Sequence, residues 1–267
     1  MTAPIHDRRP QSIGVLAERC LANVADRSLR SVTSDADQQR REFELERRRD
    51  LVQRTRDRIP LRYRDAAITH AEIAAWTDAL ISATNAVPGR GLARGGSLFL
   101  LGATGRGKTF EAYGVIRAVA EAGIAAHWAA LTEGDLFARL RPRPGVDSEA
   151  EFERVAQAEL LVLDDLGSAK ASDWTVNEVV FRLVNYRYEH MAPTVFVSNL
   201  ELDEIKERLG DRITGRLNEM AQRVVFDGND RRRQGGVASP PLTFMVPPRP
   251  VRAPGNWAPY YEEVAPG

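Results

Sequence analysis

The sequence predicts an α/β fold, in which helices flank a central parallel sheet and a small helical region precedes it. Three observations predict this fold. Apolar runs alternate with helix-like segments between residues 97 and 198. The runs Leu160–Leu163 and Thr194–Ser198 are short and apolar, as are strands that a parallel sheet buries on both faces. A glycine-rich turn follows the first apolar run and leads directly into a helix-like segment.

Residues 1–58 are predicted to form helices. Gln11–Leu29 carries apolar residues at the spacing of a modest amphipathic helix, and Ser34 is suited to cap a second helix that runs to about Arg58. Residues 40–50 are mostly charged, with both signs mixed. A solvated helix held by i,i+4 ion pairs explains this pattern. A partner-binding arm explains it too, because so polar a helix gains little by packing on its own domain.

The segment between this region and the first strand contains a break and one further helix. Pro60 disfavours helix at the residue before it, which marks the start of the α/β domain. Ile73, Trp76 and Leu80 lie at helical spacing and predict a helix over about His70–Asn85.

Residues 102–109 match the Gly-x-x-x-x-Gly-Lys-Thr pattern of a phosphate-binding loop, between the apolar run Ser97–Leu101 and a helix. Glycines let phosphate oxygens approach the backbone N–H groups closely. In this geometry Lys108 reaches the β and γ phosphates and the Thr109 hydroxyl binds Mg²⁺. The alternative is a glycine-rich turn between two core elements. The residues predicted to bind the nucleotide here are Gly102, Ala103, Thr104, Gly105, Arg106, Gly107, Lys108, Thr109 and Phe110.

Beyond this loop, strands and helices alternate, which implies right-handed crossovers and ligands at the carboxyl ends of the strands. Trp76, in the helix predicted before the phosphate-binding loop, is expected to lie in the core, and the alternative is a position near an adenine ring. The predicted elements are a strand at Ile124–Leu131, helices at Glu133–Leu140 and Ser148–Ala158, a strand at Leu160–Leu163, a helix at Asn177–Tyr188 and a strand at Thr194–Ser198.

Polar side chains follow two of the predicted strands. Asp164 and Asp165 end the run that begins at Leu160, where Asp164 is placed to hold Mg²⁺ through water and Asp165 to orient an attacking water. Asn199 ends the next strand and is able to donate a hydrogen bond to the γ-phosphate or to that water. The alternatives are a polar strand end for the two aspartates and a capping role for the asparagine.

Composition narrows the possible classes of protein. The 37 Lys and Arg residues balance 37 Asp and Glu residues, so any contact with nucleic acid must come from a local patch. Cys20 is the only cysteine, which excludes an intramolecular disulfide and a multi-cysteine zinc site. The sequence has neither the apolar core of a signal peptide nor a run that is long enough to cross a membrane. We therefore expect a soluble, cytoplasmic protein without a membrane partner.

The C-terminal residues 237–267 differ in kind from the rest. They hold 8 of the 15 prolines, so they cannot form a regular helix or a central strand. A flexible or surface-draped tail is expected, and a partner-binding peptide is the alternative. The chain is thus expected to comprise a helical partner-binding region at 1–58, an α/β domain at 59–236 and this Pro-rich tail.

Further motifs follow the phosphate-binding loop in a fixed order. They are Leu163–Gly167, Leu183–Tyr188, Val197–Leu200 and Gly210–Leu217. In this order they resemble the AAA+ ATPases of the DnaC/DnaI helicase-loader and IstB group, and Ile59–Arg64 is similar to the segment that introduces the ATPase core in that group. The resemblance covers roughly residues 57–235 and does not extend to residues 1–56 or to the tail.

The resemblance implies a Mg²⁺-dependent ATPase with an AAA+ core. Lys108, Asp164, Asp165 and Asn199 would be catalytic, with Asn199 as sensor 1. Asp165 stands where many AAA+ proteins have Glu, which implies slow turnover. The resemblance also implies that Arg216 is the arginine finger offered to a neighbouring subunit, with Arg212 as the competing residue, and that Arg232 is the sensor-2 arginine, with Arg231 as the competing residue.

The resemblance further implies a role in DNA replication. The protein would load a replicative DnaB-type hexameric helicase, gripped by the N-terminal helices, and would self-associate into an open ring or spiral around single-stranded DNA. Phe137, Arg139, Arg141 and Arg143 are the candidate DNA contacts, and a core Phe137 flanked by solvated arginines is the alternative. Two other functions stay open: an IstB-type transposition helper ATPase that remodels duplex DNA, and a nucleotide-gated adaptor with little turnover.

Overall fold

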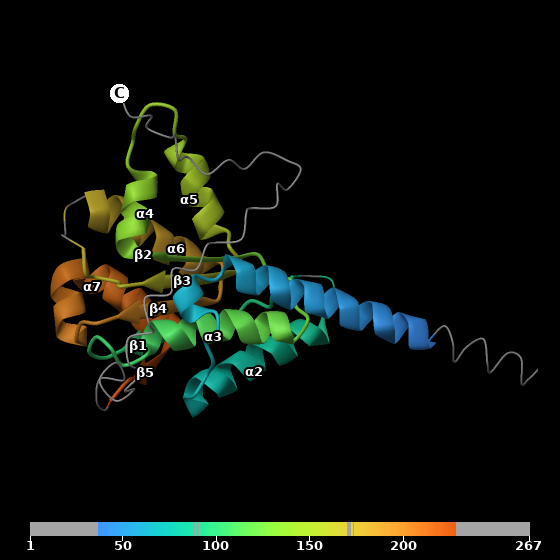
Figure 1. Ribbon diagram of the computed structural model, residues 1–267. Helices are drawn as coiled ribbons and strands as arrows, with labels where there is room; N and C mark the ends of the chain where they lie inside the picture. The colour runs from blue at the N-terminus through green and yellow to red at the C-terminus, as the bar shows by residue number, and fades with distance from the viewer. Residues whose placement is uncertain (1–36, 88, 90, 170–171, 173, 228–267) are drawn as a thin grey trace, which may run out of the picture.

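A parallel sheet forms the centre of the molecule (Figure 1). It is seen in the computed structural model of the chain, which describes residues 37–227 except for positions 88, 90, 170, 171 and 173. Its 5 strands run in the order β2-β3-β4-β1-β5, and every neighbouring pair is parallel. The predicted α/β fold is therefore confirmed. The elements are η1 (Leu61–Tyr63), α2 (Ala71–Ala86), β1 (Ser97–Leu101), α3 (Lys108–Glu121), β2 (Trp128–Thr132), α4 (Glu133–Leu140), α5 (Ser148–Ala156), β3 (Leu160–Asp164), η2 (Trp174–Val180), α6 (Phe181–Glu189), β4 (Thr194–Ser198), α7 (Leu202–Met220) and β5 (Ala221–Val225).

The central strand β1 lies between β4 and β5, and all of its residues are buried. Successive side chains of a strand point to opposite faces of the sheet. Accordingly, Phe99 and Leu101 belong to the core on one face, and Leu98 and Leu100 belong to the core on the other. Burial on both faces explains why the central strands are continuous apolar runs in the sequence.

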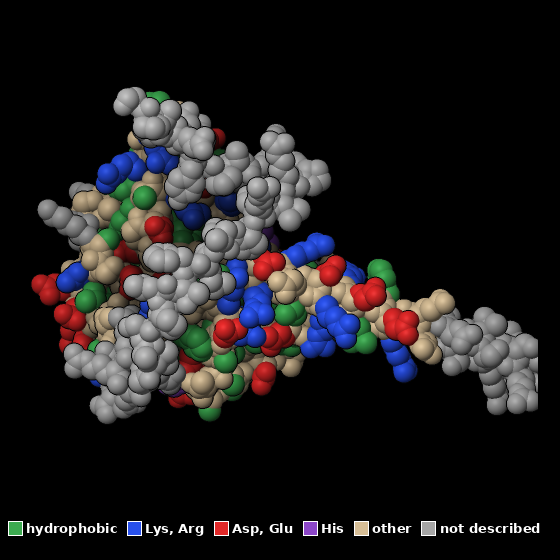
Figure 2. All heavy atoms as spheres, in the orientation of Figure 1, with side chains coloured by type: hydrophobic (Ala, Val, Ile, Leu, Met, Phe, Trp, Pro, Cys, Tyr) green, Lys and Arg blue, Asp and Glu red, His purple; other side chains and the backbone are tan. Residues whose placement is uncertain are grey.

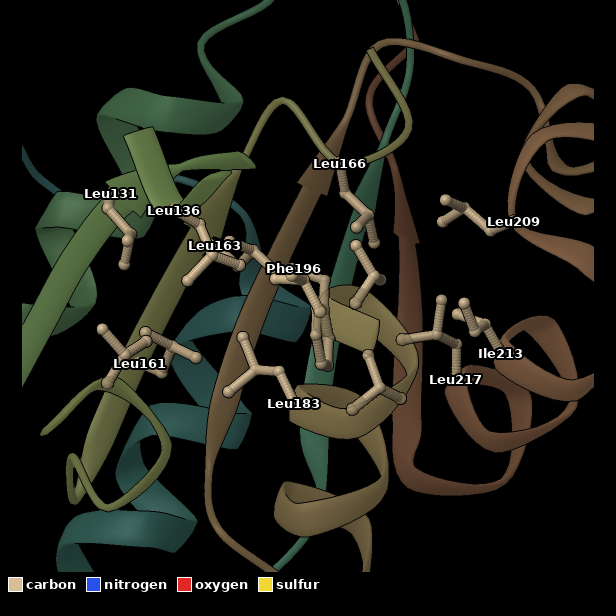
Figure 3. Close-up of a cluster of buried hydrophobic side chains, with 14 of the residues drawn as sticks. Leu131, Leu136, Leu161, Leu163, Leu166, Leu183, Phe196, Leu209, Ile213 and Leu217 are labelled. Atoms are coloured by element: carbon tan, nitrogen blue, oxygen red, sulfur yellow. The ribbon is translucent and has the colours of Figure 1, made fainter. Parts of the chain in front are cut away.

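Helices cover both faces of the sheet. α4, α5, α6 and α7 pack on the face that carries Leu163 and Phe196, and Figure 3 shows leucines of α4, α6 and α7 gathered around those two residues. α2 and α3 pack on the opposite face, against Leu100 and Val162. With both faces covered, the carboxyl ends of the strands are the edge at which a ligand site can form.

Residues 37–58 form one helix that projects from the body of the molecule (Figures 1 and 2). Its residues from 37 to 50 are all exposed, including Phe43 at 65% and Leu45 at 53%. Its base is fixed to the sheet by Arg58, whose guanidinium lies 4.2 Å from the centre of the Trp128 ring. The same guanidinium donates a hydrogen bond of 3.2 Å to the Trp128 carbonyl. The helix ends at Arg58, as predicted.

The second strand begins later than the sequence predicts. β2 starts at Trp128, whereas a strand from Ile124 was expected. The residues before it end α3 instead: Gly123 has a left-handed φ of 84°, its N–H donates to the Ala120 carbonyl, and the Ile124 N–H donates to the Val119 carbonyl. This pair of bonds is the Schellman arrangement, which uses an apolar residue after the glycine to close a helix. Ile124 is therefore part of a helix cap.

Two further elements differ from the predictions. The helix expected at Asn177–Tyr188 is a π-helical segment, η2, followed by the α-helix α6. The edge strand β5 was not predicted, because Gln222 and Arg223 interrupt its apolar residues. Both side chains are exposed, which an edge strand tolerates.

A fully buried arginine of α6 connects the end of α5 with the segments that lead into β3 and β4. Arg187 of α6 donates from Nε to Thr194 Oγ1 at 2.6 Å and from Nη2 to the Pro193 carbonyl at 2.7 Å. Its Nη1 donates to the carbonyls of Ala156 and Ala158 at 2.9 and 2.7 Å. All four acceptors are neutral, and burial lowers the pKa of the guanidinium to about 9. The side chain thus fixes the end of α5 and the starts of β3 and β4.

Several predictions fall on positions outside the described residues. These are the helix at Gln11–Leu29, the cap at Ser34 and the tail at 237–267, and they stay predictions. Among the helices that the structure describes, none combines the length and the apolarity that crossing a bilayer requires.

Candidate nucleotide-binding site

A cavity of about 1220 Å³ lies at the carboxyl ends of the strands. The phosphate-binding loop and the start of α3 form one wall, and the ends of β2, β3 and β4 form another. The cavity brings together the predicted residues 104–110 with Asp164, Asp165 and Asn199. The remaining lining residues, which the sequence did not single out as ligand contacts, are Pro60, Arg62, Tyr63, Tyr113, Ala130, Leu131, Thr132, Asp135 and Val162.

The phosphate-binding loop starts at a position that only glycine fits. Gly102 has a φ of 132°, which L side chains rarely adopt, and a Cβ atom there would lie 2.6 Å from the Phe226 carbonyl oxygen. The same carbonyl accepts a hydrogen bond of 3.1 Å from Arg106 Nη1. The loop is therefore fixed against the residue that follows β5.

We expect Gly102→Ala to lower the free energy of unfolding by about 1–3 kcal/mol, because the new Cβ would both strain the backbone and collide with Phe226. The matched control is Gly95→Ala, since a Cβ at Gly95 meets no atom within 4 Å. Urea unfolding of both variants measures the difference. Equal stabilities for the two variants would show that the loop can shift away from Phe226 without strain.

The ammonium group of Lys108 is held inside the loop. Lys108 is only 4% exposed, and its Nζ donates to the carbonyls of Gly102 and Ala103 and, at 2.8 Å, to Asn199 Oδ1. The positive charge therefore lies between the loop and the end of β4. A phosphate that entered the cavity would meet a cation whose position is already fixed.

The two residues predicted to bind Mg²⁺ are in contact. Thr109 Oγ1 donates to Asp164 Oδ2 at 2.9 Å. Burial raises the pKa of the Asp164 carboxyl, and the neighbouring charge of Asp165 raises it further, although the Thr109 hydrogen bond opposes both. A hydroxyl and a partly buried carboxylate on one side of a phosphate-binding cavity are the hard oxygen ligands that Mg²⁺ takes alongside phosphates. These residues fit the ion.

The second aspartate is tied to the predicted sensor residue. Asn199 Nδ2 donates to Asp165 Oδ1 at 2.7 Å, so the amide of Asn199 connects Asp165 with Lys108. The backbone of Asp165 is left-handed, with a φ of 55°. Aspartate and asparagine tolerate this conformation better than glutamate does. The backbone thus gives a physical reason why position 165 is an aspartate and not a glutamate.

A buried glutamate behind the cavity was missed by the sequence reasoning. Glu133 is 1% exposed and accepts a hydrogen bond of 3.0 Å from the Ala169 N–H, and burial raises the pKa of its carboxyl. Arg208 donates to the Gly167 carbonyl of the same loop at 3.0 Å. Together they hold the loop that follows Asp165. An acidic residue in the first turn of a helix usually indicates only a favourable helix dipole, which is why Glu133 gave no signal.

Two stacked tyrosines at the cavity wall were also missed. The rings of Tyr63 and Tyr113 are 4.8 Å apart between centroids and nearly parallel, at 13°. Burial raises the pKa of Tyr113 to about 12, and the charge of Asp164 adds to this rise. The sequence placed Tyr63 in the segment before the ATPase core, but the contact joins residues 50 positions apart in the chain, and no local pattern reveals it.

Other predicted residues lie away from the cavity. Arg212 and Arg216 are on α7, where their guanidinium groups lie 4.3 and 4.8 Å from the ring centre of Phe181. Neither lines the cavity of its own chain. Trp76 donates to the Gly96 carbonyl and packs at the edge of a core, so it does not lie in the cavity either. The sensor-2 candidates Arg231 and Arg232 lie outside the described residues.

One of the predicted DNA contacts is corrected by the structure. Phe137 of α4 is 8% exposed and belongs to the hydrophobic core that contains Leu163 and Phe196. Its ring centre lies 6.1 Å from that of Trp174, so the ring is not free to stack on a base. The alternative, a core phenylalanine, is what the structure has. Arg139, Arg141 and Arg143 are exposed beside it, and their contact with DNA stays a prediction.

Comparisons with known proteins identify a matching family, related sequences and solved structures that share the fold of this chain. The family profile described as IstB-like ATP binding protein matches residues 93–235. The replicative helicase loader DnaI of Bacillus subtilis (strain 168) is 27% identical over 153 residues, which are 52% of this chain and 48% of DnaI. The uncharacterized protein YqaM of the same strain is 37% identical over 73 residues, which are 24% of this chain and 23% of YqaM.

The chain thus spans about half the length of DnaI and less of YqaM. The crystal structure of the DnaC helicase loader superimposes with a TM-score of 0.52, at 24% identity, and covers 63% of this chain and 100% of that chain. At this identity the likeness shows the fold alone.

Proposed function

The chain belongs to the IstB-like ATP-binding proteins, and on this basis we propose that it hydrolyses ATP to load a replicative hexameric helicase onto single-stranded DNA. The observation that carries the proposal is the convergence of Lys108, Thr109, Asp164, Asp165 and Asn199 on one cavity. The match to a replicative helicase loader over half of the chain supports the choice of partner.

Each of these residues has a role that follows from its place. Lys108 would bind the β and γ phosphates, because its ammonium is already fixed at the loop. Asp165 would accept a hydrogen bond from the attacking water and orient it toward the γ-phosphate. Asn199, which bonds both Lys108 and Asp165, would keep the water-orienting carboxylate in register with the bound phosphate.

Thr109 and Asp164 would hold Mg²⁺, since their oxygen atoms are in contact at the mouth of the phosphate-binding loop. When bound, the ion neutralises negative charge on the β and γ phosphate oxygens.

The nucleobase would lie at the far end of the cavity from Lys108. The aromatic rings among the lining residues are those of Phe110, Tyr63 and Tyr113. Base–aromatic stacking tolerates any base and is a common source of binding energy. Phe110 and Tyr113 belong to α3, the helix that begins at Lys108, whereas Tyr63 lies in η1. We therefore expect the adenine ring to stack on Tyr63.

Completion of the site would require a neighbouring copy of the chain. Arg216, with Arg212 as the competing residue, does not reach its own cavity, so the arginine finger would act on the ATP of the adjacent subunit in an open ring or spiral. The exposed Arg139, Arg141 and Arg143 would contact the phosphates of single-stranded DNA.

The projecting helix 37–58 would bind the helicase. Its exposed Phe43 and Leu45 offer apolar contacts among mixed charges. We expect the double substitution Phe43→Ser and Leu45→Ser to reduce capture of the replicative helicase about tenfold or more, with ATP binding unchanged. The control is Val225→Ser on β5, which is exposed to a similar degree at 55%.

A second candidate function follows from the family match. Since the matching family is described as IstB-like, a transposition helper ATPase is the alternative. Capture of a transposase instead of the helicase by the full chain would favour it. A full chain that captures the helicase but shows no ATP turnover, with or without single-stranded DNA, would instead indicate a nucleotide-gated adaptor.

A further inference from the structure

Residues 59–70, which we call the strap, join the projecting helix to α2 and pack against α3. The Tyr63 ring stacks on Tyr113 of α3, and Arg117 Nη1 of the same helix donates to the Ala66 carbonyl at 2.7 Å. Between these contacts the two backbones meet: a Cβ atom at Gly114 would lie 2.8 Å from the carbonyl carbon of Ala67. The strap is therefore packed tightly onto the helix that begins at Lys108.

The C-terminal end of the strap is held by a buried carboxylate. Glu111 of α3 is 0% exposed, and its oxygen atoms accept hydrogen bonds from the Thr69 N–H, the Thr69 hydroxyl and the His70 N–H at 3.2, 2.5 and 3.0 Å. His70 Nδ1 lies 2.7 Å from the same carboxylate. A buried carboxylate is costly unless it is paired and hydrogen-bonded, so this cluster fixes Thr69 and His70 strongly.

The charge state of the carboxylate supports this role. Burial raises the pKa of Glu111, but the hydrogen bonds from Thr69 and His70 together outweigh burial, and the pKa is lowered overall. Glu111 is therefore ionised at neutral pH, and its hydrogen bonds to the strap are charge-assisted, which makes them stronger than neutral ones.

The strap also connects the Glu111 cluster, which we call the anchor, to the cavity wall and to the phosphate-binding loop. Its N-terminal part lines the cavity with Pro60, Arg62 and Tyr63. At its other end the ring of His70 lies 4.0 Å from the ring of Phe226, whose carbonyl accepts the hydrogen bond from Arg106 of the phosphate-binding loop. The cavity wall that bears Tyr63 is thus held in place by Glu111, which lies one helical turn beyond Lys108 on α3.

We propose that Glu111 is a positioning residue for nucleotide binding: it anchors the strap at Thr69 and His70 and thereby sets the wall on which the base of the nucleotide rests. This inference relies on the proposed function, because it assumes that ATP occupies the cavity. Glu111 does not line the cavity, so in this proposal it acts through the strap.

Two probes separate the strap from the phosphate-binding loop. ATP would contact both, whereas inorganic triphosphate would contact the loop without reaching the strap. For Glu111→Ala we expect the dissociation constant of ATP to rise about tenfold, while that of inorganic triphosphate changes less than about twofold. Calorimetric titration in the presence of Mg²⁺ measures both constants, and circular dichroism checks that each variant is folded.

A second variant and a control accompany the first. His70→Phe keeps the ring that packs on Phe226 and the backbone N–H that donates to Glu111, but it removes the imidazole contact with that carboxylate. We therefore expect it to weaken ATP binding in the same direction, without emptying a buried site. Glu189→Ala removes an exposed glutamate of α6 that accepts a 2.9 Å hydrogen bond from Asn185 and contacts no residue of the strap. We expect this control to bind both probes like the wild type.

The outcomes distinguish the anchor from the proposed function. If folded Glu111→Ala and His70→Phe proteins bind ATP like the wild type, the proposal that Glu111 positions the strap for nucleotide binding is wrong. If both variants lose ATP and triphosphate to the same extent, Glu111 acts on the phosphate-binding loop, and the proposal is overturned as well. If the wild type binds neither probe, the proposed nucleotide site itself is wrong. Selective loss of ATP supports the proposal.

Discussion

Replacement of Arg187 by methionine is expected to lower the free energy of unfolding by about 3–5 kcal/mol. Methionine fills a similar volume, but it cannot donate hydrogen bonds to Thr194 or to the carbonyls of Ala156, Ala158 and Pro193. The Pro193 carbonyl keeps the Leu161 N–H as a donor, but each buried acceptor that is left without a donor costs about 1–3 kcal/mol. The losses add only in part, because the strand ends can relax. Urea denaturation followed by circular dichroism measures the change.

The control for this experiment lies on the same helix. Arg182 is half-exposed and pairs with Glu149 at the surface, so Arg182→Met is expected to cost about 1 kcal/mol or less. A loss for Arg187→Met that is no larger than the loss for Arg182→Met would mean that water replaces the guanidinium without penalty. The four hydrogen bonds would then contribute nothing net to stability.

Replacement of Asp165 by asparagine is expected to lower the maximal rate of ATP hydrolysis about 10²-fold or more, with ATP affinity nearly unchanged. The amide keeps the size of the side chain and fits the left-handed backbone at this position, but it loses the negative charge that would orient the attacking water. Steady-state phosphate release measures the rate, and calorimetric titration measures the affinity.

Asp147→Asn is the control for the loss of one negative charge. Asp147 caps the N-terminus of α5 by accepting hydrogen bonds from Glu149 and Ala150, and asparagine caps equally well. We expect wild-type turnover from this variant. A rate for Asp165→Asn within a few fold of the wild type would exclude Asp165 as the residue that orients the water and would favour the adaptor function.

The phosphate-binding loop could be predicted from the sequence because its shape depends on local features. Gly102 adopts a φ that side chains avoid, and Lys108 begins a helix directly after the loop. Asp164 and Asn199 could be placed because they end buried parallel strands, and the ends of such strands meet at one edge. These inferences need only backbone geometry and the pattern of apolar residues.

Contacts between distant segments could not be predicted in the same way. The anchor of the strap joins Glu111 to His70, and the aromatic stack joins Tyr113 to Tyr63, so neither leaves a periodic pattern in the chain. Phe137 was ambiguous for another reason: a phenylalanine among arginines fits a buried helix face and a DNA-binding helix equally well, and only its packing against Trp174 decides between them.

The continuity of the projecting helix with the strap has a mechanical consequence. Residues 37–58 form an unbroken helix of roughly 33 Å at 1.5 Å per residue, and its contacts lie in its C-terminal part, where Thr55 is buried, Arg56 pairs with Asp65 and Arg58 packs on Trp128. Such a helix would act as a lever whose pivot lies two residues before Pro60, which lines the nucleotide cavity. A tilt of about 5° at the pivot moves the far end by about 3 Å over this length. A displacement too small to alter the cavity visibly would therefore still shift the surface that carries Phe43.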